Sequence, residues 1–302
     1  MLSITLVFIL FIIIAFLGVS FYFSRVVIKP KTEDYDETLK IELELERFSK
    51  KFFNSLEKED VFIKSPHGND LHGLWIPCKS SENTVILLHG FTYTLYGSVK
   101  YLNIFRKRGY NVLMPDNRFH GQSGGKNITF GYLEKDDVKA WIDWIVDKTD
   151  NNYYIGIHGE SMGASVAMQH ASIDKRASFY ITDSMFSDME DALAFSLKKD
   201  YKLPRFPLLK MAGIMSFIQG GVLFPKISPR KLISELEVPI FFIHGEEDAV
   251  IPSYMAEILY NVKKGKKKLW IATGSDHSMS LCIHPEEYEK KVYEFLTEIK
   301  AP

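Results

Sequence analysis

A serine stands between two glycines in the stretch GESMG (residues 159–163), which follows the apolar run YYIGIH and precedes an alanine-rich segment. A G-x-S-x-G placed between a strand and a helix forms a sharp, strained turn that presents the serine hydroxyl. Glycines are needed on both sides because side chains there would collide with the strand and the helix. The motif alone is weak, but its placement predicts that Ser161 is a nucleophile.

A serine hydroxyl becomes nucleophilic when a neighbouring base takes its proton and an acid fixes the tautomer of that base. In sheets that carry such a turn, the chain order is serine, then aspartate or glutamate, then histidine. Asp248 lies in the loop after the apolar run at 239–244, and His277 lies in the loop after the run at 268–272. We therefore predict Asp248 as the acid and His277 as the base.

Other residues compete for these two roles. Asp183 ends an earlier apolar run, and a strand end at that place can also reach the histidine. Glu246 and Glu247 precede the predicted acid, whereas Asp276 adjoins His277 and is poorly placed to hydrogen-bond its ring. The alternative for His277 is a surface-loop histidine without a role in the chemistry.

Acyl transfer passes through a tetrahedral intermediate whose oxyanion needs preformed hydrogen-bond donors. One donor is expected to be the backbone N–H of Met162, and the other should come from the loop after the early run TVILLHGFT. Phe91, which follows Gly90 in that loop, is the predicted second donor. Each donor is worth about 3 kcal/mol in the transition state. The alternative for the sequence His89-Gly90 is an ordinary turn.

Short apolar runs recur along the chain and predict the strands that position these residues. Each is followed, usually after a turn, by a segment with helical spacing. Continuous β-rich runs that alternate with helices predict an α/β fold with a mostly parallel central sheet and helices on both faces. A hairpin over 61–77 should precede it, because two alternating segments flank the turn PHGND. The runs are residues 84–89, 110–115, 153–158, 178–183, 239–244 and 268–272, and the helical segments include 132–148, 161–171, 253–262 and 286–300.

The segment between Asp183 and Val238 is too long for an ordinary connection. It contains the apolar stretch FPLLKMAGIMSFIQGGVLFP, in which Gly220-Gly221 is a possible hinge. We predict an inserted helical cap at about 185–228, above the sheet. The alternative, a transmembrane hairpin, is disfavoured because Lys210 and Gln219 bound a run shorter than a membrane span needs.

The N-terminal stretch from Ile4 to Phe23 has no charge and is almost wholly apolar. About 20 such residues span the hydrocarbon core of a bilayer as a helix, so residues 1–30 are predicted to be a transmembrane anchor. A cleaved signal peptide is the main alternative, but no Lys or Arg precedes the run and Gly18-Val19-Ser20 is a weak cleavage site. A buried soluble helix would show a polar face, which this stretch lacks.

Arg25, Lys29 and Lys31 follow the apolar run, although acidic residues come soon after them. The positive-inside rule therefore predicts a single-pass protein of the cell membrane whose remaining chain lies in the cytoplasm. Residues 31–58 are expected to form an amphipathic linker with one helix from Glu37 to Leu56, packed on the domain. Residues 59–302 are expected to form the α/β domain.

Composition excludes several other classes of function. The chain has 302 residues, 46% of them hydrophobic, which suffices for one large domain with a buried core. The formal net charge of −1 does not favour nucleic acid as a partner. Cys78 and Cys282 do not make a disulfide framework, and no histidine pair has the spacing of zinc ligands. No metal site is predicted.

Five motifs together resemble the α/β-hydrolase superfamily over roughly Val61 to the C-terminus. The likeness is greatest to bacterial, often membrane-anchored members grouped with serine aminopeptidases and lysophospholipase-like hydrolases. The resemblance implies catalytic roles for Ser161, Asp248 and His277, and it implies no cofactor. It also implies structural roles for the other loop histidines His89, His120, His158 and His244. The motifs are LLHGF (87–91), PDNRFHGQSGG (115–125), GESMG (159–163), IHGEEDAVIP (243–252) and GSDH (274–277).

These observations predict a membrane-tethered serine hydrolase that cleaves a carboxylic ester through an acyl-enzyme intermediate. The apolar cap suggests a hydrophobic acyl group, and with the anchor it suggests a lipid-like ester as substrate. A peptidase or amidase that uses the same three residues is one alternative. An inactive hydrolase fold that serves as a membrane scaffold is another, although a scaffold has no need of all three groups.

Overall fold

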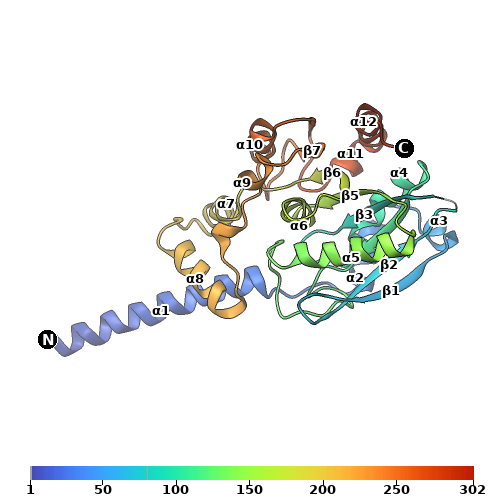
Figure 1. Ribbon diagram of the computed structural model, residues 1–302. Coiled ribbons are helices and arrows are strands. Elements are labelled where there is room, and N and C mark those ends of the chain that lie inside the picture. The colour runs from blue at the N-terminus through green and yellow to red at the C-terminus, as the bar shows by residue number, and fades with distance from the viewer. Residues whose placement is uncertain (1, 80) are drawn as a thin grey trace.

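The computed structural model describes residues 2–79 and 81–302, and in these residues eight strands form a single sheet (Figure 1). The strand order is β1-β2-β4-β3-β5-β6-β7-β8. β2 pairs antiparallel with β1 and β4, and all other neighbours are parallel, so the expected mostly parallel sheet and its leading hairpin are confirmed. The strands are β1 (Glu59–Lys64), β2 (Asp70–Ile76), β3 (Asn83–Leu88), β4 (Asn111–Pro115), β5 (Tyr154–Glu160), β6 (Ala177–Asp183), β7 (Ile240–Gly245) and β8 (Lys267–Ala272).

Helices cover both faces of the sheet, which explains why the central strands are apolar along their whole length. One face is covered by α5 (Glu134–Lys148), α6 (Met162–Ala171), α9 (Pro229–Ile233) and α10 (Tyr254–Val262). The other face is covered by α3 (Lys50–Ser55), η1 (Leu95–Tyr101), α4 (Leu102–Arg106) and α12 (Pro285–Glu298). In α5, Trp141, Ile142 and Ile145 recur at helical spacing and are fully buried against the strands.

The long connection between β6 and β7 is helical, as expected of an inserted cap. It contains α7 (Met189–Tyr201), α8 (Leu208–Gly220) and η2 (Phe224–Lys226). α8 ends where Gly221 adopts a φ of 70°, a conformation that glycine takes without steric cost. The predicted hinge at Gly220-Gly221 is therefore the end of a helix, beyond which the chain bends by 89°.

α1 (Leu2–Ile28) projects from the body of the molecule at its N-terminal end (Figure 1). Among the described residues it is the one helix that is long and apolar enough to cross a membrane unbroken, with a mean hydropathy of 3.0. The segments 208–220 and 224–233 meet the same criterion only as one broken span, and a signal sequence would also have the length and composition of α1. The last third of α1 differs from the rest, because Ser20, Ser24 and Ile28 are fully buried against the body.

The single helix expected from Glu37 to Leu56 is wrong. The chain forms α2 (Tyr35–Glu44), with a capping box between Asp34 and Glu37, and then the short α3. The helix stops after Glu44 because Glu46 takes a left-handed φ of 51° and Ser49 caps a new helix through Phe52 N–H. The break turns Arg47 inward, where it pairs with buried Glu42 at 3.0 Å. As expected, this segment packs on the domain.

Candidate active site

Ser161 lies on the sharp turn between β5 and α6, with φ 51° and ψ −113°. This backbone conformation is costly for a serine and is held by the surrounding structure, including a hydrogen bond from Ser161 N–H to Asp183 O of 2.8 Å. The two flanking glycines are needed for steric reasons. A Cβ atom at residue 159 would lie 2.4 Å from the carbonyl oxygen of residue 163, and one at Gly163 would lie 2.2 Å from that of Leu88.

The loops after β7 and β8 bring two other predicted residues to this turn. His277 Nε2 lies 3.0 Å from Ser161 Oγ, although the residues are 116 positions apart in the chain. On the other side of the ring, His277 Nδ1 lies 2.7 Å from Asp248 Oδ2. Both distances are within hydrogen-bond reach, which is the geometry that a general base needs. The side chain of Asp248 is fully buried and that of His277 is 19% exposed.

The loop backbone and a second histidine hold Asp248 in place. Its Oδ1 accepts the N–H groups of Val250 at 2.9 Å and Ile251 at 2.7 Å. Its Oδ2 also lies 3.1 Å from His244 Nε2, a nitrogen that donates to Ile251 O. Burial alone would raise the pKa of Asp248, but the hydrogen bonds from His244 and His277 hold it well below its usual range. Asp248 is therefore ionised at neutral pH.

The same contact shifts the titration of His277 in the opposite direction. Burial would lower the pKa of His277, but the hydrogen bond to Asp248 and the negative charge of that carboxylate outweigh it. The pKa of His277 is therefore raised from its ordinary value. An imidazole in this position is a stronger base toward Ser161, and its protonated form is stabilised.

The competing carboxylates lie elsewhere. Asp183 is hydrogen-bonded to the hydroxyls of Tyr101 and Tyr288, and burial raises its pKa to about 6. In the described part of the chain, the Asp276 carboxylate accepts only backbone N–H groups, those of Ala249 and His277. Glu246 accepts the N–H of residue 274, and Glu247 is exposed. Of the carboxylates in the described residues, Asp248 is the one bonded to the ring of His277.

The two predicted oxyanion donors lie beside Ser161. Met162 is the first residue of α6, so its N–H has no partner within the helix. Phe91 follows Gly90, where a Cβ atom would lie only 3.7 Å from Ser161 Cβ. Among the hydrogen bonds of the described residues, none is donated by the N–H of Phe91 or Met162. His89 fixes this loop, because its Nδ1 donates to Gly90 O and its Nε2 accepts an N–H from Asn117.

A cavity of about 230 Å³ opens beside the nucleophile, and we call it the Ser161 cavity. Its walls come from the end of α1, the cap helix α7, the turn of Ser161 and the loops after β3, β4, β6 and β7. All the lining side chains are apolar except those of Ser161 and Ser196. Phe91 and Phe130 form part of this lining as a stacked pair with ring centroids 5.5 Å apart. The cavity therefore suits an aliphatic or aromatic group better than a charged one.

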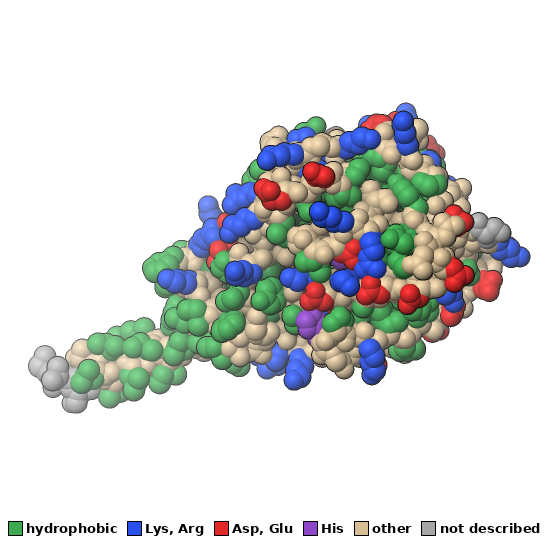
Figure 2. Space-filling model, in the orientation of Figure 1, with side chains coloured by type: hydrophobic (Ala, Val, Ile, Leu, Met, Phe, Trp, Pro, Cys, Tyr) green, Lys and Arg blue, Asp and Glu red, His purple; other side chains and the backbone are tan. Residues whose placement is uncertain are grey.

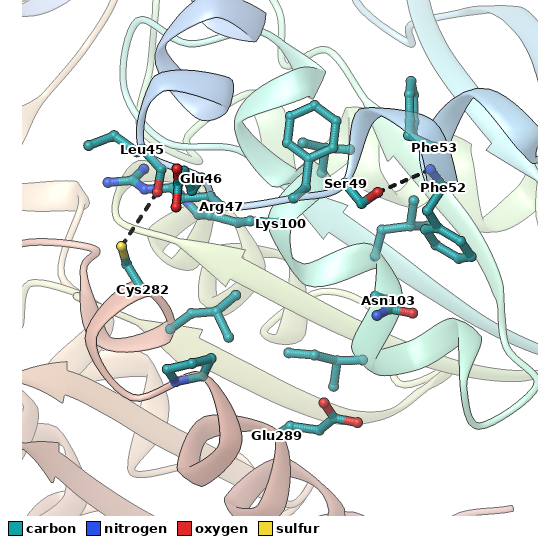
Figure 3. Close-up of a pocket in the computed structure, with 16 residues that line it drawn as sticks. Leu45, Glu46, Arg47, Ser49, Phe52, Phe53, Lys100, Asn103, Cys282 and Glu289 are labelled. Atoms are coloured by element: carbon teal, nitrogen blue, oxygen red, sulfur yellow. Dashed lines mark hydrogen bonds between the residues drawn. The ribbon is translucent and has the colours of Figure 1, made fainter.

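A second cavity, of about 420 Å³, lies between the α2–α3 linker, α4 and the start of α12 (Figure 3). Its wall includes Arg47, Lys100 and Cys282, whose Sγ approaches Leu45 O (Figure 3). None of the three predicted catalytic side chains lines it. It is therefore separate from the Ser161 cavity.

Sequence reasoning missed a group of buried charges beneath the turn of Ser161. Lys100 Nζ lies 2.6 Å from Glu160 and 3.6 Å from Glu42, which in turn pairs with Arg47. The Tyr101 hydroxyl also donates to Glu160, at 2.6 Å. Burial would raise the pKa of Glu160, but the charge and hydrogen bond of Lys100 hold it below its usual value. No pattern in the sequence marks these residues, because charged side chains are normally expected at the surface.

The motif at residues 115–125 has a structural role. Asp116 is buried and accepts the N–H of Leu95 at 2.8 Å, the hydroxyl of Tyr35, and a hydrogen bond from His72 Nδ1. Gly121 has a φ of 50°, and a Cβ atom there would lie 2.3 Å from the Asp116 carboxylate. The motif at 115–125 thus fixes the loop after β4 and anchors α2.

His89, His120, His158 and His244, for which structural roles were expected, are all buried. Burial lowers the pKa of His120 and of His158 to about 3, so both rings are neutral. Each forms a hydrogen bond inside the fold, from His120 to Arg118 O and between His158 and Tyr288. No three His, Cys, Asp or Glu side chains in the described part of the chain lie close enough together to hold a metal ion.

Comparisons with known proteins agree with this fold. A family model of the α/β hydrolase fold matches residues 83–212. The uncharacterized protein YqkD of Bacillus subtilis is 36% identical over 287 residues, which is 94% of either chain. The solved esterase Pf2001 of Pyrococcus furiosus is 31% identical, with a TM-score of 0.69, over 83% of this chain and 96% of its own. The lysophosphatidylserine lipase ABHD12 of Xenopus tropicalis is 26% identical over 69% of this chain and 54% of its own length.

Proposed function

The chain belongs to the α/β-hydrolase family, and from that premise we propose that it is a membrane-tethered serine hydrolase that cleaves carboxylic esters with a hydrophobic acyl group. Its esterase and lipase relatives support hydrolase activity in general. The observation that carries the proposal is the chain of hydrogen bonds from Ser161 through His277 to Asp248. These two hydrogen bonds join one nucleophile, one base and one acid in a partly buried site.

In the first half of the reaction, Ser161 Oγ attacks the ester carbonyl while His277 Nε2 takes the hydroxyl proton. Asp248 keeps the proton of Nδ1 on the ring and stabilises the imidazolium that forms. The N–H groups of Phe91 and Met162 stabilise the oxyanion of the tetrahedral intermediate. His277 then gives its proton to the leaving alcohol, and the acyl group remains on Ser161.

In the second half, water takes the place of the alcohol. His277 removes a proton from the water as it attacks the acyl-enzyme carbonyl, and the same two N–H groups stabilise the second oxyanion. Collapse of this intermediate releases the carboxylic acid, and the proton returns from His277 to Ser161. No metal or cofactor takes part in this scheme.

The composition of the Ser161 cavity supports an ester over a peptide with a free amino terminus. An aminopeptidase needs carboxylates to hold the α-ammonium group of its substrate. No acidic side chain lines the Ser161 cavity, and the lining is apolar apart from two serines. A hydrophobic acyl group can fill this space without leaving a charge unpaired.

The proposal includes the predicted division of the chain into an anchor at 1–30, a linker at 31–58 and a hydrolase domain at 59–302. The burial of Ser20, Ser24 and Ile28 against the body supports a retained anchor over a cleaved signal peptide. Arg25, Lys29 and Lys31 support a single-pass topology with the domain in the cytoplasm.

The proposal is tested by comparing the full chain with its Ser161→Ala and His277→Gln variants on esters and on aminoacyl amides. We expect wild type to cleave p-nitrophenyl esters faster than aminoacyl p-nitroanilides, and both variants to lose at least about a thousandfold in kcat. A wild type that prefers the amides is a peptidase instead. A wild type no faster than the variants on any substrate is an inactive scaffold.

A further inference from the structure

The end of the membrane helix forms part of the Ser161 cavity. Val26 and Val27, on the last turn of α1, line this cavity together with Phe91 and Met162. The next residue, Ile28, is completely buried, and its carbonyl accepts the N–H of residue 128 at 2.9 Å. A segment that the sequence assigns to the anchor therefore contributes to the surroundings of the nucleophile.

The cap helices α7 and α8 hold this part of α1 in position. Gln219 Nε2 donates to Ser24 Oγ at 2.9 Å, and the ring of Phe23 packs edge-on against Tyr201 with centroids 4.8 Å apart. A Cβ atom at Gly220 would lie 2.9 Å from Ile28 Cδ1, so the two helices are in close contact. The anchor cannot leave the cavity without also separating from the cap.

This packing determines how deep the cap lies relative to a bilayer. Residues 2–19 precede the buried part of α1, and at about 1.5 Å per residue they extend about 27 Å. This length is close to the hydrocarbon thickness of about 30 Å. The part of α1 that packs on the cap therefore begins at the bilayer surface, and the Ser161 cavity lies just beyond it.

The outer surface of the cap suits that location. On α8, Ile214, Phe217 and Ile218 are 44–70% exposed and extend the apolar surface of α1. Figure 2 shows hydrophobic side chains continuing from the projecting helix onto the body, with Lys and Arg side chains around them. The exposed cap lysines are Lys198, Lys199, Lys202, Lys210 and Lys226. An apolar surface with a basic margin matches an anionic membrane.

We propose that the last turn of α1 is the wall against which the acyl chain of the substrate lies, and that the substrate is a single-chain acyl ester taken from the bilayer that holds α1. The inference rests on the proposed function and specifies its substrate class. A cavity of about 230 Å³ is smaller than the roughly 300–1,000 Å³ of drug-sized ligand sites, which favours one chain over two. Val26 and Val27 are thus specificity-determining residues.

The role of Val26 and Val27 is tested by replacing them with larger side chains that fill the cavity. Val26→Trp and Val27→Trp are compared with Val7→Trp, a matched substitution on the same helix at an exposed position outside the cavity. The full chain in detergent is assayed on p-nitrophenyl acetate and dodecanoate. Because each lost methylene contact weakens binding severalfold, we expect the first two variants to lower the dodecanoate-to-acetate ratio of kcat/KM by about tenfold or more. Val7→Trp should leave the ratio unchanged.

Fluorophosphonate labelling separates this inference from the proposed function. A wild type that does not label overturns the proposed function. Labelling that persists in Val26→Trp and Val27→Trp with an unchanged ratio overturns only the role of the wall. If neither variant labels, the role of the wall is tested with Val26→Ala and Val27→Ala. These substitutions enlarge the cavity and should change the dodecanoate-to-acetate ratio of kcat/KM. An unchanged ratio would contradict the proposal.

The membrane source is tested with wild type in proteoliposomes and monooleoylglycerol as the probe. The ester is placed either in the same vesicles as the protein or in separate protein-free vesicles at equal total concentration. We expect hydrolysis to be about tenfold or more faster in the shared vesicles, because both reactants are confined to one surface. Equal rates in the two arrangements would show that the ester is taken from water and would overturn this part of the proposal.

Discussion

His277 links the two ends of the candidate triad, and its neighbours determine the pH range in which it can act as a base. The ring must be neutral at Nε2 to take a proton from Ser161, whereas contact with Asp248 raises its pKa above the ordinary value. Sequence order was sufficient to predict this trio, because each member follows a strand whose end lies on one edge of a parallel sheet. The support from His244 could not be predicted, because it depends on a loop that folds back on Asp248.

The pH dependence of the reaction should report this contact. Since His277 acts as a base only when neutral, kcat/KM for p-nitrophenyl butyrate should fall as the pH drops through a raised pKa, above about 6.5. In Asp248→Asn the charge that raises this pKa is gone, so the acidic limb should move to lower pH. The rate at neutral pH should also fall by about 10⁴-fold. An acidic limb that stays in place would rule out Asp248 as the partner of His277.

The glycines around Ser161 can be tested individually. In Gly163→Ala the new Cβ atom would lie 2.2 Å from Leu88 O, so the turn must shift. We expect this shift to lower the unfolding free energy by about 1–3 kcal/mol and to abolish activity. The control is Gly213→Ala on α8, where a Cβ atom would lie 3.4 Å from Phe224. That variant should keep its activity, as measured by ester hydrolysis and thermal unfolding. Full activity in Gly163→Ala would contradict the steric argument.

The sequence predicted the strands and their connecting helices well, but it did not predict the break in the N-terminal linker. Apolar strands carry a strong signal because both of their faces are buried. The linker broke at residues 45–49 for a tertiary reason, since Arg47 turns inward to Glu42 and the buried group around Lys100. The helical pattern of residues 37–56 does not show that one of them will pair with a buried side chain of another element.

The buried charges should make the linker and the serine turn mutually dependent. Lys100→Met leaves Glu160 and Glu42 without their common cation, and breaking a buried pair typically costs about 3–5 kcal/mol in unfolding free energy. The matched control is Lys107→Met, because Lys107 pairs with Glu289 at the surface and should cost less than about 1 kcal/mol. Denaturant unfolding followed by tryptophan fluorescence measures both. Equal losses in the two variants would contradict a structural role for the buried group.

In the whole molecule, α1 packs directly on the α/β fold. The sequence predicted the apolar helix from its length and composition, and the fold from its five motifs. It could not predict that the last turn of α1 reaches the Ser161 cavity, because nothing in the composition of α1 distinguishes Val26 and Val27 from Val7 and Val19 earlier in the helix. That placement arises only when α8 packs beside α1.

The two cysteines allow the topology to be measured in cells. Cys78 and Cys282 are partly exposed free thiols on the domain. If the domain is cytoplasmic, a membrane-impermeant maleimide should label them only after permeabilisation. A Ser3→Cys variant that also carries Cys78→Ser and Cys282→Ser should label in intact cells, since residue 3 then lies outside. Labelling of the native cysteines in intact cells would place the domain on the outer side.

The proposed mechanism depends on activation of the Ser161 hydroxyl by His277 and Asp248. The most direct measurement is labelling of the full chain with a fluorophosphonate, followed by peptide mass mapping. One adduct is expected per chain, on the peptide that contains Ser161, with no adduct in Ser161→Ala and strongly slowed labelling in His277→Gln. An adduct on another residue, or labelling that is equal in wild type and Ser161→Ala, would show that Ser161 is not the activated nucleophile.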